Sequence, residues 1–243
     1  MDVSTKLSRN TAVSNEEQTA VPYRELVGFL MYIAMGSRPD IAHAVSCLIC
    51  YNDCYQNAHW TVKRVLRYLR GTLDYSIIYK STGGQSLIGF VNADWGSCPD
   101  DSRSYSGYVF VLGGGSIIWE SRKQRTVALS STEAQYMGVS DAFKEDLYLR
   151  KFVGELGLKI LGVVIVLCDN LEAQKLALNP IFHSRTKHID IRHHFVREKL
   201  ESGEIALRHV STEDMAADVL TKGLPRDKHN KCLRSLEMSR LPA

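Results

Sequence analysis

Apolar residues recur at helical spacing through the first third of the chain. A polar stretch over 1–21, expected to be a tail or linker, precedes PYRELVGFLMYIAM, which predicts an amphipathic helix. Its expected apolar face consists of Leu26, Phe29, Leu30 and Ile33. A second helix is expected after GSRPD, where Asp40 can cap it. AHWTVKRVLRYLR predicts a third helix, ending at Gly71, and YSIIYK predicts a short strand.

The pattern changes to strands after STGGQS at 81–86, which we expect to be a domain boundary. Three β-rich runs, SLIGFVNADW, YSGYVFVLGG and GSIIWESR, predict an antiparallel meander. A helix is expected from about Ser131 and a second helix over DLYLRKFVGEL, and GVVIVLCDN is continuously apolar, as in a central strand buried on both faces. LEAQKLAL predicts a helix, GEIALRHV a last strand and EDMAADVLTKGL a closing helix. This order predicts an α/β fold in which helices cover a mixed sheet.

Composition adds little to this picture. With 44% hydrophobic and 23% charged residues, the 243-residue chain is typical of a globular protein of one large or two modest domains. A net charge of +3 gives weak support for a polyanionic partner. No apolar run reaches the roughly 18 residues that span a membrane, and the N-terminus lacks a signal-peptide core. We therefore expect a cytoplasmic or nuclear protein that is neither membrane-bound nor secreted.

The cysteines fit such a compartment as free thiols. The six are Cys47, Cys50, Cys54, Cys98, Cys168 and Cys232. Cys47 and Cys50 form a C-x-x-C, which is compatible with redox or zinc chemistry. No second C-x-x-C accompanies it, and helical spacing places both with Cys54 on one helix face. Burial as small apolar residues is the favoured interpretation.

Four acidic residues lie where an element ends or where an acid is out of place. They are Asp94, Glu133, Asp169 and Asp218. Each alone has an ordinary explanation: Asp94 as a turn residue, Glu133 as the acid of a capping box. In the same way, Asp169 could cap the helix after it, and Asp218 could face solvent.

Taken together, the four acids suggest metal chemistry. If the first and fourth strands are parallel neighbours, Asp94 and Asp169 would face each other, and two helices could bring in Glu133 and Asp218. Such close carboxylates repel one another unless cations neutralise them. Their hard oxygen atoms favour Mg²⁺ or Mn²⁺, and two such ions are the device for attack on a phosphodiester. The acids therefore predict a two-metal site, with Asp94 as the bridging ligand.

Long segments of the chain resemble the ribonuclease H domain of copia-type (Pseudoviridae) retrotransposon Pol polyproteins. They are NADWGSCPDDSRSYSGYVFVLGGGSIIWESRKQRTVALSSTEAQYM, CDNLEAQKLALNPIFHSRTKHIDIRHHFVREKLESGEI and STEDMAADVLTKGLP. PYRELVGFLMYIAMGSRPDIAHAVS and AHWTVKRVLRYLRGTLDYSIIY resemble the segment that connects the polymerase to that domain. The resemblance covers almost everything from Pro22 to Leu224.

The resemblance implies a ribonuclease H-like fold: a mixed five-stranded sheet flanked by helices, after a small, mostly helical connection segment. It implies four parts: a tail or linker over 1–21, the connection segment over 22–82, the ribonuclease H domain over 83–224 and a C-terminal tail over 225–243. It also implies cleavage of RNA in RNA–DNA hybrids with two Mg²⁺ or Mn²⁺ ions, inside a virus-like particle. The polymerase domain of the same polyprotein would be a partner. Its palm and paired aspartates are not in this chain, so we expect a fragment rather than a complete reverse transcriptase.

The resemblance places the catalytic acids at Asp94, Glu133, Asp169 and Asp218. This chain departs from the family at Asn92, usually acidic, at Gln135, usually Glu, and at Cys98. VSTEDMAAD also lacks the histidine that cellular ribonucleases H carry before the last catalytic Asp. These departures leave two hypotheses open: an active ribonuclease H, or a catalytically weak or inactive remnant that binds hybrids.

Basic and hydroxyl residues form the expected nucleic-acid surface. A helix N-terminus favours phosphate, and RNA is sensed through its 2′-hydroxyls. The candidates are Arg122, Lys123, Arg125, Ser131, Thr132, Asn170, Arg185, Lys187 and Arg192. Histidines in FHSRTKHIDIRHHFVREK raise a zinc alternative, but no cysteine pair accompanies them, so structural or phosphate-facing roles are favoured.

Overall fold

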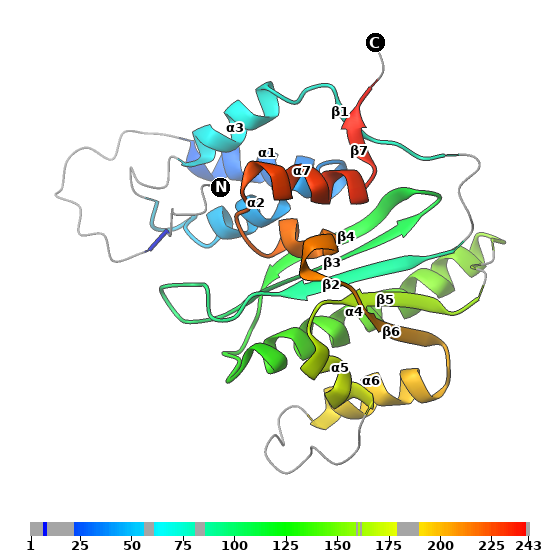
Figure 1. The fold of residues 1–243 in the computed structure, drawn as a ribbon. Coiled ribbons are helices and arrows are strands. Elements are labelled where there is room, and N and C mark those ends of the chain that lie inside the picture. The colour runs from blue at the N-terminus through cyan, green and yellow to red at the C-terminus, as the bar shows by residue number, and fades with distance from the viewer. Residues whose placement is uncertain are drawn as a thin grey trace.

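A five-stranded mixed sheet forms the centre of the molecule (Figure 1). The computed structural model describes residues 7–8, 22–55, 61–80, 86–158, 160, 162–178 and 190–241. The strand order is β4-β3-β2-β5-β6, in which β2, β3 and β4 are antiparallel and β5 and β6 run parallel to β2. The strands are β2 (Ile88–Ala93), β3 (Tyr105–Leu112), β4 (Gly115–Lys123), β5 (Val164–Cys168) and β6 (Ile205–His209). This order and these directions confirm the predicted ribonuclease H-like sheet.

Each face of the sheet has its own apolar core. On one face lies α4 (Ser131–Glu155), followed by α5 (Leu171–Leu178) and α6 (Asp190–Glu201) (Figure 1). The other face packs against η5 (Ala216–Leu220) and α7 (Arg226–Ser235). Alternation along β2 explains the division, because Val91 belongs to the α4 core and Phe90 contacts the η5 core.

The N-terminal segment is mostly helical, as predicted. It contains α1 (Tyr23–Gly36), η1 (Pro39–Ile41), α2 (Ala42–Ile49), α3 (Val62–Arg70) and the short strand β1 (Tyr75–Ile77). The apolar face expected for α1 was partly wrong, because Phe29 is 71% exposed. The buried residues are Tyr23, Val27, Leu30 and Ala34. Their spacing is the stripe that lets α1 pack along α2.

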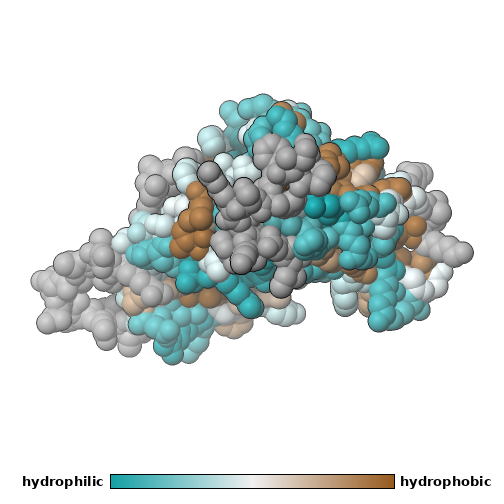
Figure 2. Space-filling view, turned by 90° about the horizontal axis from the view of Figure 1, so that it is seen from below, coloured by the Kyte–Doolittle hydropathy of each residue, from teal (hydrophilic) through white to brown (hydrophobic). Residues whose placement is uncertain are grey.

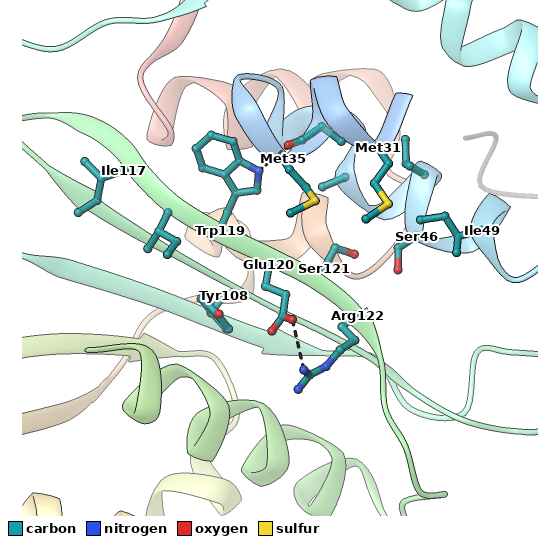
Figure 3. A pocket seen from close by; sticks show the side chains of 14 residues that line it. Met31, Met35, Ser46, Ile49, Tyr108, Ile117, Trp119, Glu120, Ser121 and Arg122 are labelled. Carbon is teal, nitrogen blue, oxygen red and sulfur yellow. Dashed lines mark hydrogen bonds and ion pairs between the residues drawn. The ribbon is translucent and has the colours of Figure 1, made fainter. Parts of the chain in front are cut away.

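A pocket of about 600 Å³ lies between α1, α2 and β4 (Figure 3). Met31 and Met35 face it from α1, and Trp119 faces it from β4. The indole nitrogen of Trp119 donates a hydrogen bond to the carbonyl oxygen of Ala34, at 2.8 Å. This bond ties the helical segment directly to an outer strand of the sheet.

The described part of the predicted C-terminal tail, 225–241, has regular structure. Within it, α7 is followed by β7 (Met238–Arg240), which pairs antiparallel with β1. A buried ion pair between Arg38 and Asp40 also reaches α7, because Tyr68 donates to Asp40 at 2.6 Å and contacts His229 at 3.1 Å. The C-terminal residues therefore close the molecule against its N-terminal segment.

The closing helix predicted from EDMAADVLTKGL consists of two short 3-10 helices, η4 (Thr212–Asp214) and η5. All six cysteines are free thiols, as predicted. Among the described residues, no helix is long and apolar enough to cross a membrane.

Gly107 in β3 allows η5 to approach the sheet closely. A Cβ atom there would lie 2.5 Å from Leu220 Cβ and 3.0 Å from the Glu120 carbonyl oxygen. We predict that Gly107→Ala lowers the free energy of unfolding by about 2 kcal/mol or more, because η5 must shift. Gly154→Ala is the control, since a Cβ atom added to Gly154 in α4 would have no atom within 4 Å. It should be neutral or stabilising in chemical denaturation, and equal effects would contradict the close approach.

His43 in α2 should make stability depend on pH. Its ring packs edge-on against Tyr105, and burial lowers the pKa of His43 to about 3. The unfolded chain therefore binds a proton that the folded chain does not, so stability falls as pH drops below about 6.5. Between pH 7.5 and pH 5 the unaltered chain should lose up to about 2 kcal/mol more than His43→Gln. Equal losses in urea denaturation would contradict this account.

Candidate functional site

The carboxyl ends of β2 and β5 lie side by side, which confirms the predicted parallel pairing. The register joins Val91 to Cys168. Val91 and Cys168 are the last pair in this register. The next residues, Asn92 and Asp169, therefore lie level with each other just beyond the paired part of the two strands. Asp94 lies two residues further along. The position level with Asp169 is therefore occupied by an amide, and not by the acid that we expected there.

Asp94 organises a loop. Its carboxylate accepts a hydrogen bond from the backbone N–H of Tyr105 at 2.7 Å and another from the hydroxyl of Ser97. Gly96, with φ of +62°, turns the chain between them. Burial raises the pKa of Asp94 to about 6, against the lowering effect of these hydrogen bonds. Both carboxylate oxygens thus have partners within the loop, which is the turn role considered first for this residue.

Glu133 caps α4. Its backbone N–H donates to the hydroxyl of Ser130 at 3.1 Å, and its carboxylate accepts from the backbone N–H of Leu129 at 2.8 Å. This arrangement resembles a capping box and satisfies amide groups at the helix start. Of the two roles considered for Glu133, helix cap and metal ligand, the cap agrees with the hydrogen bond that its carboxylate accepts from Leu129.

Asp218 is buried and surrounded by donors, so the solvent-facing alternative for it was wrong. It is 1% exposed. Its carboxylate accepts from the Asn92 side-chain amide at 2.5 Å. Lys222 Nζ lies 2.8 Å from one oxygen, and Lys228 Nζ lies 3.4 Å from the other. Two ammonium groups and an amide therefore stabilise this carboxylate in its buried position.

Asp169 stays partly exposed at the end of β5. One oxygen accepts from the Thr212 hydroxyl at 3.1 Å. The cap of α5 is Asn170, whose side-chain oxygen accepts from the Ala173 N–H at 2.9 Å. Asn170, predicted as a nucleic-acid contact, thus has a structural role, and Asp169 is not the cap considered for it.

Asn92 and Gln135 meet at the end of β2. The backbone N–H of Ala93 donates both to the Asn92 side-chain oxygen, at 2.8 Å, and to the Gln135 side-chain oxygen, at 2.7 Å. The Gln135 amide reaches the Val91 carbonyl at 3.1 Å and the Cys168 sulfur at 3.3 Å. Side chains from β2, α4 and η5 therefore converge here, and two of the three are neutral amides.

The predicted gathering of all four acids is therefore not what the structure shows. Among the residues that the structure describes, no three His, Cys, Asp or Glu side chains are placed to hold a metal ion. Asp218 and Asp169 remain at the sheet edge, whereas Asp94 and Glu133 are held in a loop and a helix cap. The departures from the family at Asn92 and Gln135 are the sequence signal for this arrangement, because these two side chains meet at the end of β2. The two predicted Mg²⁺ or Mn²⁺ ions do not fit the arrangement as it stands.

Three of the predicted nucleic-acid contacts form ion pairs, two of them with Asp141 in the middle of α4. Arg122 and Arg192 both pair with Asp141, at 3.0 and 3.4 Å, and Lys123 pairs with Asp101 at 2.7 Å. Exposed positions near the start of α4 are Arg125 and Ser131, with Thr132 half-buried. Arg185 and Lys187 lie outside the described residues.

Trp95 adds an aromatic surface near these residues. Its indole is 61% exposed, and its N–H donates to the carbonyl oxygen of Ala128 at 3.2 Å. Leu129, in the loop before α4, is 74% exposed. Seen from below the view of Figure 1, the described surface is largely hydrophilic, with smaller hydrophobic areas between (Figure 2).

Comparison with known proteins gives relatives that match this chain over nearly all of its length. The chain is 39% identical over all of its 243 residues to the retrovirus-related Pol polyprotein from transposon RE2 of Arabidopsis thaliana. It is also 39% identical, over 96% of its length, to the Pol polyprotein from transposon TNT 1-94 of Nicotiana tabacum. The matches cover 16% and 17% of these relatives, so the chain spans about a sixth of their length. No protein-family model matches the chain.

Two solved structures show more distant similarity. A foamy viral protease-reverse transcriptase in complex with dsDNA matches 84% of this chain and 40% of its own, with 14% identity and a TM-score of 0.49. RNase H1 from Halobacterium salinarum matches 56% of this chain and 94% of its own, with 15% identity and a TM-score of 0.41. The strand order and directions described above remain the basis of the fold assignment.

The loop role of Asp94 can be tested without nucleic acid. We predict that Asp94→Ala lowers the free energy of unfolding in EDTA by about 2 kcal/mol, because the N–H of Tyr105 loses its side-chain acceptor. Asp53→Ala is the control, since Asp53 forms an exposed ion pair with Arg24 and should contribute little. A loss of stability that appears only in the presence of Mg²⁺ would instead identify Asp94 as a metal ligand.

Proposed function

The chain belongs to the family of the retrovirus-related Pol polyproteins of copia-type transposons, and from this premise we propose that it binds RNA–DNA hybrids as a ribonuclease H-type domain with an incomplete cleavage centre. Family and fold together support a nuclease of the ribonuclease H type. The RNA–DNA hybrid as ligand, and the loss of cleavage, are the parts that we propose. Of the two hypotheses raised by the sequence, the site geometry favours the remnant.

The observation that carries the proposal is the closed network around Asp218. Two-metal hydrolysis of a phosphodiester needs several carboxylates that neutralise and position the ions. At the end of β2 the protein supplies Asn92 and Gln135, whose oxygens carry no formal charge. The negative charge of Asp218 is already balanced by Lys222 and Lys228. A divalent cation would have to displace ammonium groups and compete with a satisfied hydrogen-bond network.

Loss of cleavage does not require loss of binding. Phosphate contacts provide most of the affinity of such proteins for nucleic acid, and they depend on cations at the surface. Arg122 is 44% exposed and pairs with both Asp141 and Glu120, in a position where ion pairs contribute little to stability. A phosphate can therefore replace the carboxylates at small cost. Arg125 is exposed, and the N-terminus of α4 presents the hydroxyl of Ser131 beside it.

Trp95 suits a nucleic-acid surface of this kind. Its ring is exposed while its N–H is anchored to the Ala128 carbonyl, so the indole is presented in a fixed orientation. An aromatic face can stack on a base or pack on a sugar without reading sequence. Together with the basic residues before α4, it supports binding by shape and charge.

The proposed partner within a longer polyprotein is the polymerase part. Large apolar side chains on α1 are exposed, with Phe29 at 71%, Tyr32 at 80% and Met35 at 68%. Exposed apolar groups on one helix face are typical of a contact surface. The chain spans about a sixth of its full-length relatives, so most of such a polyprotein lies outside it.

Hybrid binding should be measurable in EDTA by fluorescence anisotropy of a labelled RNA–DNA duplex. We expect tighter binding to the hybrid than to double-stranded DNA of the same sequence. Arg125→Ala should weaken hybrid binding severalfold and lower the slope of log K against log salt by about one. Lys151→Ala is the control. Lys151 lies near the C-terminal end of α4, roughly 30 Å from Ser131 at 1.5 Å per residue, and so outside the proposed contact surface.

The same duplex tests cleavage. With Mg²⁺ or Mn²⁺ the unaltered chain should leave the RNA strand intact under conditions where it is fully bound. Metal-dependent cleavage that EDTA stops and Asp94→Asn abolishes would contradict the incomplete centre. Equal affinity for the hybrid and for double-stranded DNA would contradict the proposed ligand.

A further inference from the structure

We infer that Asn92 and Gln135 occupy the two positions at which carboxylates would complete a divalent-cation site with Asp169 and Asp218. In this chain the two amides and two lysines keep that site closed. The inference rests on the proposed function, because it names the residues that make the centre incomplete. It also assigns to the site a ligand set that differs from Asp94, Glu133, Asp169 and Asp218.

Asn92 has the position of a ligand. It follows the last residue of β2 that pairs with β5, it is 4% exposed, and its amide lies 2.5 Å from an oxygen of Asp218. Asn and Asp have nearly the same shape. A carboxylate at this position would therefore place an oxygen next to Asp218, where the two charges require a proton or a cation between them.

Gln135 reaches the same place from α4. Its side-chain oxygen shares the N–H of Ala93 with the oxygen of Asn92, at 2.7 and 2.8 Å. Its amide nitrogen lies 3.3 Å from the sulfur of Cys168, the residue before Asp169. A glutamate of the same length would bring a second negative oxygen to the junction of β2 and β5. Carboxylates at 92, 135 and 218 would then meet at the end of β2, with Asp169 level with position 92 at the end of β5.

Lysines take the role that a metal would have. Lys222 and Lys228 contact different oxygens of Asp218, and Lys228 also donates to the carbonyl oxygen of Thr212. Its side chain is only 16% exposed, so α7 delivers a largely buried cation to the centre. An ammonium group can neutralise one carboxylate but cannot coordinate several oxygens around one centre.

Asp94 and Glu133 each lie two residues from these positions, and both have structural partners. The Asp94 oxygens accept from Ser97 and Tyr105, and Glu133 accepts from Leu129. They are therefore matched controls: Asp94 follows β2 directly and Glu133 lies in α4, but their contacts differ from those of Asn92 and Gln135.

The test compares the unaltered chain with Asn92→Asp, Gln135→Glu and the double variant. Mn²⁺ uptake is followed by loss of the free Mn²⁺ signal in electron paramagnetic resonance, and thermal unfolding is followed by circular dichroism in EDTA and in Mn²⁺. The double variant should take up Mn²⁺ at least about tenfold more tightly than the unaltered chain. Its unfolding midpoint should fall in EDTA, because the new charges repel, and recover with Mn²⁺.

Further variants of the double variant identify the ligands. Asp94→Asn with Glu133→Gln should leave Mn²⁺ uptake unchanged, whereas Asp169→Asn should weaken it about tenfold or more. Lys228→Met should strengthen uptake, because a competing cation is removed. If the double variant does not fold even with Mn²⁺, the single variant Asn92→Asp is used in its place. It should take up Mn²⁺ more tightly than the unaltered chain, by a smaller factor than that expected for the double variant.

Two results would overturn the inference: a folded double variant that takes up no more Mn²⁺ than the unaltered chain, or uptake by the unaltered chain that Asp94→Asn abolishes. Hybrid affinity is measured on the same proteins in EDTA. If none binds the hybrid while the double variant takes up Mn²⁺, the proposed function fails and the cation site stands. If the proteins bind the hybrid but the double variant gains no Mn²⁺ uptake, the proposed function stands and the cation site is overturned.

Discussion

A buried carboxylate needs compensating charge, and this requirement governs the carboxyl edge of the sheet. Asp218 is 1% exposed, and the protein meets its charge with Asn92, Lys222 and Lys228. Burying such a charge without partners would cost several kcal/mol. The Asn92 amide of β2 and the Lys228 ammonium group of α7 therefore both stabilise the Asp218 carboxylate of η5, and these contacts join the three elements.

The rest of the molecule places these groups. Gly107 lets η5 approach β3, so that Asp218 reaches the end of β2. Pairing of β7 with β1, and the contacts of His229 with Tyr68, hold α7 between the sheet and the helical segment. Lys228 lies on this helix, which is why its ammonium group reaches Asp218. The C-terminal residues thus shape the centre, although they lie far from β2 in sequence.

Much of this could be predicted from the sequence, because it depends on local pattern. The meander and the central strand in GVVIVLCDN follow from periodicity, and the resemblance supplies their arrangement. The two helices expected from Ser131 and over DLYLRKFVGEL are one continuous helix, α4, because Lys144 and Glu145 between them are good helix formers. The end of β2 was harder. Asn92 and Asp94 are two residues apart, so strand alternation assigns both to one face, and only the register with β5 separates them. In α4, Glu133 satisfies the capping pattern, and only the contact of Gln135 with the end of β2 shows which of the two side chains faces the site. The C-terminal strand could not be predicted, because β7 is three residues long and its partner β1 lies more than 150 residues away.

The claim that the centre is closed without metal can be tested most directly by NMR of the side-chain amide groups during a Mg²⁺ titration of the unaltered chain. Asn92 and Gln135 should give resonances that are protected from solvent exchange, because their amides donate to Asp218 and to Val91. We expect these resonances to keep their positions as Mg²⁺ is added. Saturable shifts of these resonances together with those around Asp94, Glu133 and Asp169 would contradict the closed centre, and would show that the four acids form a metal site after all.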